Sequence, residues 1–217
     1  MFLRIMCALA AFLVLFPAAT VLGQDVKLEA GEIPTPEDVS PAMQEVVGKT
    51  SYSVTVDGEV TAHFWFLGDP LMSDNPSTEL GVAFGQLPQG GLLGVVQLVK
   101  PWSDYKNNSI QEGTYTLRYA VMPADGNHMG VAPYRDFLLL SSAAGDPDPT
   151  KNLNFVELLM SSNEASGVPH PAVLALFPIW DEISEPTLTK NEMDQWTIAV
   201  KLGDQVFGFV ILGHGEA

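Results

Sequence analysis

The sequence has 217 residues, with 26 acidic and 10 basic side chains and a formal net charge of −16. So acidic a chain repels nucleic-acid phosphates and anionic lipid headgroups, which argues against a nucleic-acid partner. Its one cysteine, Cys7, lies in the N-terminal apolar segment. The rest of the chain therefore lacks the thiolate that blue-copper sites, iron–sulfur clusters, most structural zinc sites and thiol enzymes need.

The first 23 residues have the layout of a secretory signal peptide. Arg4 precedes an apolar run over 5–18, and small or tolerated residues lead to Gln24. The run is shorter than the roughly 20 apolar residues of a membrane span, so we expect cleavage, with a retained anchor as the alternative. Removal of 1–23 takes away one basic residue and gives a net charge of −17. We therefore predict a secreted or periplasmic protein with no membrane span after cleavage.

After the signal, residues 24–50 are expected to form an acidic leader and a short helix. The polar, proline-bearing stretch 24–39 predicts an extended leader, either mobile or lying along the domain. Ser40 followed by Pro41 is typical of a helix N-cap with proline in the first turn, so a helix is expected through about Val47.

The remaining chain, 51–217, is predicted to be a single mainly β domain. Apolar and polar residues alternate from Ser51, and Asp57-Gly58 and Gly203-Asp204 are typical hairpin turns. Only 152–161 has the spacing of a longer helix. The sequence thus favours an antiparallel β-sandwich, jelly-roll-like, with one or two short helices. Expected strands are 51–57, 59–67, 80–84, 92–99, 113–122, 136–141, 172–177, 195–202 and 205–212.

The segment 122–140 is the leading candidate for a binding site. It is a polar loop between two expected strands, and loops held by a rigid β scaffold often carry function. The alternative is structural, with Arg135 pairing with a carboxylate to fasten the loop. The candidate ligand-binding residues are Asp125, Asn127, His128, Tyr134 and Arg135.

Metal binding is a second hypothesis. Imidazole is the commonest transition-metal ligand, but no two of the histidines have helix-pair or strand-pair spacing, so the fold would have to gather them. Calcium is the other possibility, because Asp146 and Asp148, or Asp125 and Asn127, place oxygen atoms at alternate positions. The candidate metal ligands are His128, Asp125, His63 and His170, with His214 and Asp136 as further members of a histidine–carboxylate site.

Aromatic and acidic side chains offer weaker signals for carbohydrate. A platform on which sugar rings stack could come from Trp65, Trp102, Trp180 and Trp196, with Tyr105 and Tyr134. Trp102 and Tyr105 stand in a polar, loop-like stretch and are expected to be the more exposed, whereas Trp65 and Trp196 fall in strand-like stretches typical of core. The acidic stretch 181–185 could supply the two carboxylates of a glycosidase, although sequence neighbours rarely have the required separation, and a solvated acidic face is the ordinary outcome.

No Gly-x-Ser-x-Gly, Walker or Rossmann motif is present in the sequence. The segments LLGVVQLVKPWSDY, GTYTLRYAVMPADGNHMG, APYRDFLLL, HPAVLALFP and VILGHGE resemble those of uncharacterised secreted proteins of environmental bacteria. That resemblance implies export and assigns no activity.

Two hypotheses follow. In the first, the protein is an exported, non-enzymatic β-sandwich without a cofactor, which binds a small molecule, glycan or protein through the 125–135 loop. In the second, it is a metal-dependent protein or enzyme with a histidine–carboxylate site, holding calcium or a transition metal.

Overall fold

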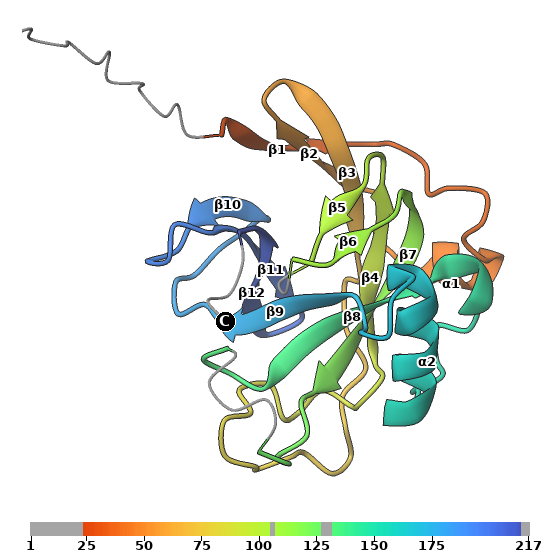
Figure 1. Cartoon of the computed structure of the whole chain (residues 1–217), viewed down its shortest axis with the longest axis vertical. Coiled ribbons are helices and arrows are strands. Elements are labelled where there is room, and N and C mark those ends of the chain that lie inside the picture. The colour runs from red at the N-terminus through yellow and green to blue at the C-terminus, as the bar shows by residue number, and fades with distance from the viewer. Residues whose placement is uncertain (1–23, 105–106, 127–131, 214–217) are drawn as a thin grey trace, which may run out of the picture.

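The computed structural model describes residues 24–104, 107–126 and 132–213, and it confirms a mainly β, antiparallel fold with few helices (Figure 1). Most strands belong to one continuous sheet in which every neighbouring pair is antiparallel. In spatial order they are β1 (Val26–Gly31), β2 (Ser51–Val56), β3 (Glu59–Phe66), β4 (Leu92–Leu98), β7 (Gly113–Val121), β8 (Asp136–Ser142), β9 (Val173–Pro178), β12 (Gln205–Leu212), β11 (Trp196–Leu202) and β10 (Thr187–Lys190). A small separate hairpin pairs β5 (Trp102–Ser103) with β6 (Ser109–Ile110).

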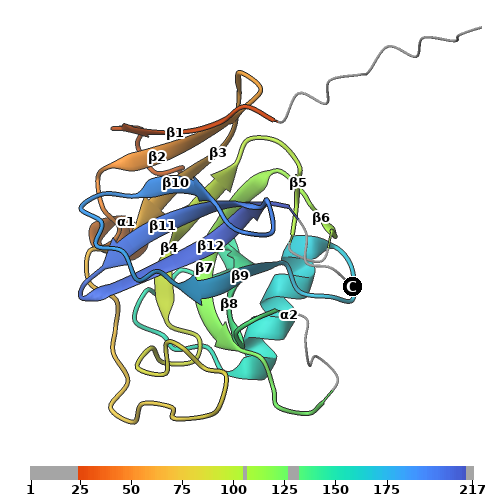
Figure 2. The ribbon, with the colours of Figure 1, turned by 90° about the vertical axis from the view of Figure 1, so that its left-hand side faces the viewer.

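This sheet curls until its two edge strands, β1 and β10, lie near each other, so that it is almost closed into a barrel (Figure 2). Alternate residues of each strand point inward, and rings such as Phe64, Phe66 and Phe209 meet across the interior with centroids less than 6 Å apart. The two layers expected of a sandwich are therefore opposite walls of one curled sheet.

The last four strands depart from a simple up-and-down order. β10, β11 and β12 follow one another as hairpins, yet β12 and not β10 lies beside β9. This arrangement is a Greek key, and it requires a connection over 179–186 that crosses the end of the sheet. The connection passes the turn between β11 and β12, which places both segments at the same end of the molecule.

Local sequence signals account for the short elements. The Ser40 hydroxyl accepts a hydrogen bond from the backbone N–H of Met43 and caps α1 (Pro41–Val46), as predicted. The hairpin turn at Asp57-Gly58 is also confirmed, with φ values of 51° and 85°, because a two-residue turn of this kind needs the left-handed region at both positions.

The longer helix, α2 (Phe155–Ser166), begins and ends later than the predicted 152–161. Asn154 is its N-cap, and Glu157 completes a capping box by accepting from the Asn154 backbone N–H. The helix ends at Gly167, which takes a left-handed conformation. Its Leu158 is fully buried against the outer face of β8 and β9, so α2 covers the sheet from outside.

The leader follows one of its two expected courses, and one expected strand is absent. The leader 24–39 lies along the domain, because it contains the edge strand β1, which pairs with β2. Within β1, Val26, Leu28 and Ala30 alternate with more polar residues. Residues 80–84 do not form the expected strand. Their backbone N–H groups at Ala83 and Phe84 bond to a side chain instead of a neighbouring strand.

An ion pair is buried on the outer face of β7. Arg118 is completely buried, and its guanidinium meets the Asp146 carboxylate through two hydrogen bonds of 2.8 and 2.7 Å. The Asp146 carboxylate also accepts from the Thr116 hydroxyl. The Asp146 carboxylate is therefore part of a buried ion pair and is not a ligand in the calcium loop considered above. The other guanidinium N–H groups donate to the carbonyls of Gly90, Lys151 and Asp148, so all five are used.

None of the helices within the described ranges is long and apolar enough to cross a membrane.

Candidate functional site

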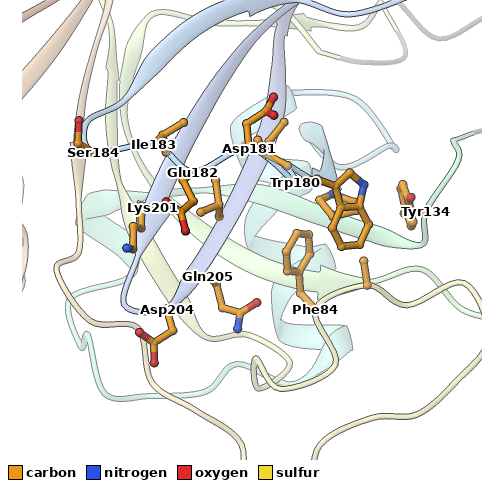
Figure 3. A pocket seen from close by; sticks show the side chains of 14 residues that line it. Phe84, Tyr134, Trp180, Asp181, Glu182, Ile183, Ser184, Lys201, Asp204 and Gln205 are labelled. Atoms are coloured by element: carbon orange, nitrogen blue, oxygen red, sulfur yellow. The ribbon is translucent and has the colours of Figure 1, made fainter.

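A cleft of about 860 Å³ lies at the end of the sheet where the Greek-key connection passes the β11–β12 turn (Figure 3). The connection supplies residues 179–184 and the turn supplies Lys201 and 204–206. The opposite wall comes from Ala83 and Phe84, and from Tyr134 just before β8. Four segments far apart in the sequence therefore meet here.

Three aromatic side chains, one from the connection and two from the opposite wall, line this cleft, which we call the Trp180 cleft. Trp180 is 87% exposed, whereas Phe84 is 2% exposed and Tyr134 is half-buried. In Figure 3 the indole of Trp180 lies between Phe84 and Tyr134. An indole left almost wholly in water, beside other rings, is typical of a surface that is covered when a ligand binds.

The charged groups of the Trp180 cleft are mostly acidic. Asp181 and Glu182 follow Trp180 directly, and Asp204 stands on the β11–β12 turn, with Lys201 as the one cationic side chain among the described residues that line the cleft. Gln205 adds an amide. The arrangement provides hydrogen-bond acceptors beside an apolar platform, and it disfavours an anionic ligand.

A buried carboxylate holds the wall that carries Phe84. Asp136, at the start of β8, is completely buried and accepts hydrogen bonds from the backbone N–H groups of Ala83 (2.8 Å) and Phe84 (3.1 Å). The hydroxyl of Tyr119 on β7 donates to the same carboxylate at 2.7 Å. Strand β8 thereby fixes a segment that has no strand partner of its own.

Arg135, the residue before Asp136, also binds the segment that leads to Phe84. Its guanidinium donates to the Glu79 carboxylate at 2.8 Å, to the Leu80 carbonyl at 3.2 Å, and twice to the Met122 carbonyl. This is the structural alternative considered above for Arg135, a fastening of the loop through a carboxylate.

Alkaline pH is expected to destabilise the fold through Tyr119. Burial, followed by the hydrogen bond to Asp136, raises the pKa of Tyr119 far above 10. The unfolded chain loses this proton near pH 10 and the folded chain keeps it, so the stabilisation from Tyr119 is fully present below pH 10 and is lost progressively as the pH rises above 10. The free energy of unfolding should fall by about 1.4 kcal/mol per pH unit above pH 10 from this group. Urea titrations at several pH values measure the slope, and Tyr119→Phe should lessen it; an equal slope in Tyr119→Phe would contradict the assignment.

The structure separates the residues that the sequence groups in one loop. Tyr134 lines the Trp180 cleft, while Asp125 lines a second cavity beside α2. The candidate metal ligand His170, from outside this loop, lines the second cavity as well. Asn127 and His128 lie outside the described residues, as do Tyr105 and His214.

The candidate metal ligands that the structure describes have other contacts. The Nδ1 atom of His63 lies 2.8 Å from the Ser53 hydroxyl on β2, and burial lowers the pKa of His63. His170 has its Nδ1 atom 2.9 Å from the Pro171 carbonyl oxygen. Within the described residues no three histidine, cysteine, aspartate or glutamate side chains are grouped to hold a metal ion. A site that includes His128 stays a prediction.

The aromatic prediction needs a correction. Trp102 is 9% exposed and packs edge-on against Phe64, because the β5–β6 hairpin contributes Trp102 and Ile110 to the main hydrophobic core. The exposed tryptophan is Trp180, one of the possible platform residues but not one of the two aromatics expected to be exposed. Its setting, between a strand and the polar run Asp181-Glu182, is the signal that was available.

Comparisons with protein-family models, curated protein sequences and solved structures find no match to this chain. What the Trp180 cleft can do is set by its chemistry. It can stack a flat, weakly polar face on an indole and accept hydrogen bonds from hydroxyl or ammonium groups next to that face.

Proposed function

We propose that this protein is exported and binds carbohydrate, without catalysis, in the Trp180 cleft. The observation that carries the proposal is the 87% exposed indole of Trp180, set among aromatic and hydrogen-bonding side chains in a cleft of about 860 Å³. The signal-like segment at 1–23 supports export, and it would deliver the protein to a compartment where free and cell-surface glycans occur.

Carbohydrate fits both the aromatic and the acidic side chains of the cleft. One face of a pyranose ring carries C–H groups that stack on an aromatic ring, and Trp180 offers such a ring with Tyr134 beside it. The ring's hydroxyl groups point outward and donate to carboxylates, of which Asp181, Glu182 and Asp204 are in place. A few polar groups around an apolar wall are the usual composition of small-ligand sites.

The charge of the site selects among carbohydrates. Three carboxylates and one ammonium line the cleft, within a chain of net charge −16. Uronic acids, sulfated sugars and phosphorylated ligands would be repelled. We therefore expect neutral or amino sugars to bind and acidic glycans to be excluded.

Replacing Trp180 by alanine tests the proposal. Loss of the stacking surface, worth about 1 kcal/mol, should weaken binding of neutral oligosaccharides at least about fivefold. Because the side chain is exposed, the free energy of unfolding should change by less than about 0.5 kcal/mol. A glycan array followed by isothermal titration calorimetry on residues 24–217 gives the affinities.

Met193→Ala is the matched control, since Met193 is 52% exposed and does not line the cleft. It should bind as the unchanged protein does. Failure to bind any neutral or amino sugar, or equal binding by Trp180→Ala, would overturn the proposal. Release of reducing ends from a bound glycan would contradict the absence of catalysis.

A further inference from the structure

A second cavity, which we call the α2 cavity, lies outside the sheet and encloses about 380 Å³. α2 forms one wall with Phe155 and Leu159, and the outer face of β8 forms another with Phe137 and Leu139. The segment 169–171, which leads into β9, forms a third wall. The α2 cavity shares no lining residue with the Trp180 cleft, so it is a separate candidate site.

Hydrogen bonds tie two of these walls together. The Ser162 hydroxyl on α2 accepts from the Ala172 backbone N–H at 2.9 Å and donates to the Ala172 carbonyl at 3.2 Å. One turn further along α2, the Ser166 hydroxyl donates to the His170 carbonyl at 2.6 Å. The helix cannot shift to close the α2 cavity without breaking these bonds. The cavity is therefore preformed, as most small-molecule sites are.

The lining of the α2 cavity offers apolar surface and almost no charge. The described residues that line it are apolar except for Asp125 and His170, and none of them is a lysine or an arginine. Asp125 is exposed and already interacts with another residue of the chain. The Nδ1 atom of His170 lies 2.9 Å from the Pro171 carbonyl oxygen and 3.4 Å from the Asn108 amide nitrogen. Both polar side chains are thus already engaged within the protein.

We propose that the α2 cavity binds a small, neutral, apolar molecule of about the size of two fused aromatic rings. A cavity of about 380 Å³ with an apolar lining suits such a ligand, whereas an α-helix of a partner is too wide to enter. The ligand lies between α2 and β8, and the removal of apolar surface from water drives its binding. A carboxylate or ammonium group would lose hydration that this lining does not replace, so ions are disfavoured.

Three probes with one apolar body test the neutral class. Isothermal titration calorimetry on residues 24–217 should give the tightest binding for naphthalenemethanol, and binding at least about fivefold weaker for naphthylmethylammonium and for naphthoate. The titrations are made at about 0.15 M salt, where the net charge of −16 acts on the probes only weakly. A charged probe that binds as tightly as the alcohol, or no binding of the alcohol, would overturn the proposal.

Two variants with opposite effects on volume place the binding site. Leu159→Trp fills the α2 cavity and Phe155→Ala removes contact surface, and each should weaken the binding of naphthalenemethanol at least about fivefold. Met160→Trp and Val156→Ala are the matched controls, because these side chains are 65% and 62% exposed and do not line the cavity. Both controls should bind as the unchanged protein does. Equal binding by the variants and their controls would overturn the location.

The Trp180 cleft is tested separately with the same probe. Trp180→Ala should bind naphthalenemethanol as the unchanged protein does, although it should bind neutral sugars more weakly. Loss of probe binding in Trp180→Ala would show that the probe occupies the Trp180 cleft and would overturn the assignment to the α2 cavity. Failure of the carbohydrate proposal would leave the binding of naphthalenemethanol unaffected, so the two results are distinguishable.

Discussion

Replacing Arg118 with methionine is expected to lower the free energy of unfolding by about 3–5 kcal/mol. The change leaves the Asp146 carboxylate buried, with only the Thr116 hydroxyl to compensate its charge. It also removes the donor that three backbone carbonyls share. Arg118→Lys should recover only part of the loss, because an ammonium group cannot make the two-point contact with the carboxylate. Urea denaturation of residues 24–217 measures each change.

The contrast with an exposed ion pair makes this result specific. Lys27 pairs with Asp25 at 3.1 Å, with both side chains more than half exposed, and Lys27→Met should cost less than about 1 kcal/mol. The double variant Arg118→Met/Asp146→Leu should be less destabilised than the sum of its single changes, since it leaves no unpaired charge. Additive losses, or a small loss for Arg118→Met, would show that the pair is not coupled as its geometry indicates.

Replacing Asp136 with alanine is the second large effect, about 3 kcal/mol or more. Three donors lose their acceptor in a buried place, namely the N–H groups of Ala83 and Phe84 and the Tyr119 hydroxyl. Each unsatisfied buried group costs about 1–3 kcal/mol. Hydrogen exchange at the Ala83 and Phe84 amides should accelerate, because this carboxylate is what binds them.

Asp148→Ala is the matched control. The Asp148 carboxylate is exposed and accepts from the Thr150 backbone N–H, so its loss should cost less than about 1 kcal/mol. If Asp136→Ala is as stable as Asp148→Ala, or if exchange at Phe84 does not change, the wall of the Trp180 cleft is held by something other than Asp136.

Most of the sheet is predictable because its strands carry local signals. β4, β7 and β8 are long apolar or alternating runs, and Asp57-Gly58 fixes one hairpin by itself. The stretch 80–84 has the same β-like composition, yet its backbone partner is the Asp136 side chain, more than fifty residues away. A long-range hydrogen bond of this kind leaves no trace in a local pattern.

The buried ion pair and the candidate site are less predictable than the strands. Arg118 reads as an ordinary polar residue in a strand, and only the folded chain brings Asp146 and the three carbonyls around it. Trp180 and Trp102 have similar polar neighbours in the sequence, but one is 87% exposed and the other 9%. Exposure is decided by which loop folds over which ring, and this depends on the Greek-key connection and the β5–β6 hairpin.

The approach of β1 to β10 has a consequence for the order in which the chain can fold during synthesis. β1 is made long before β10, which follows it by some 160 positions. Until β10 emerges, it does not yet lie near the outer edge of β1, so a second nascent chain can approach that edge and pair with it. Chains that stop before residue 187 should therefore associate through β1, and production of soluble protein should depend on the C-terminal hairpins arriving promptly.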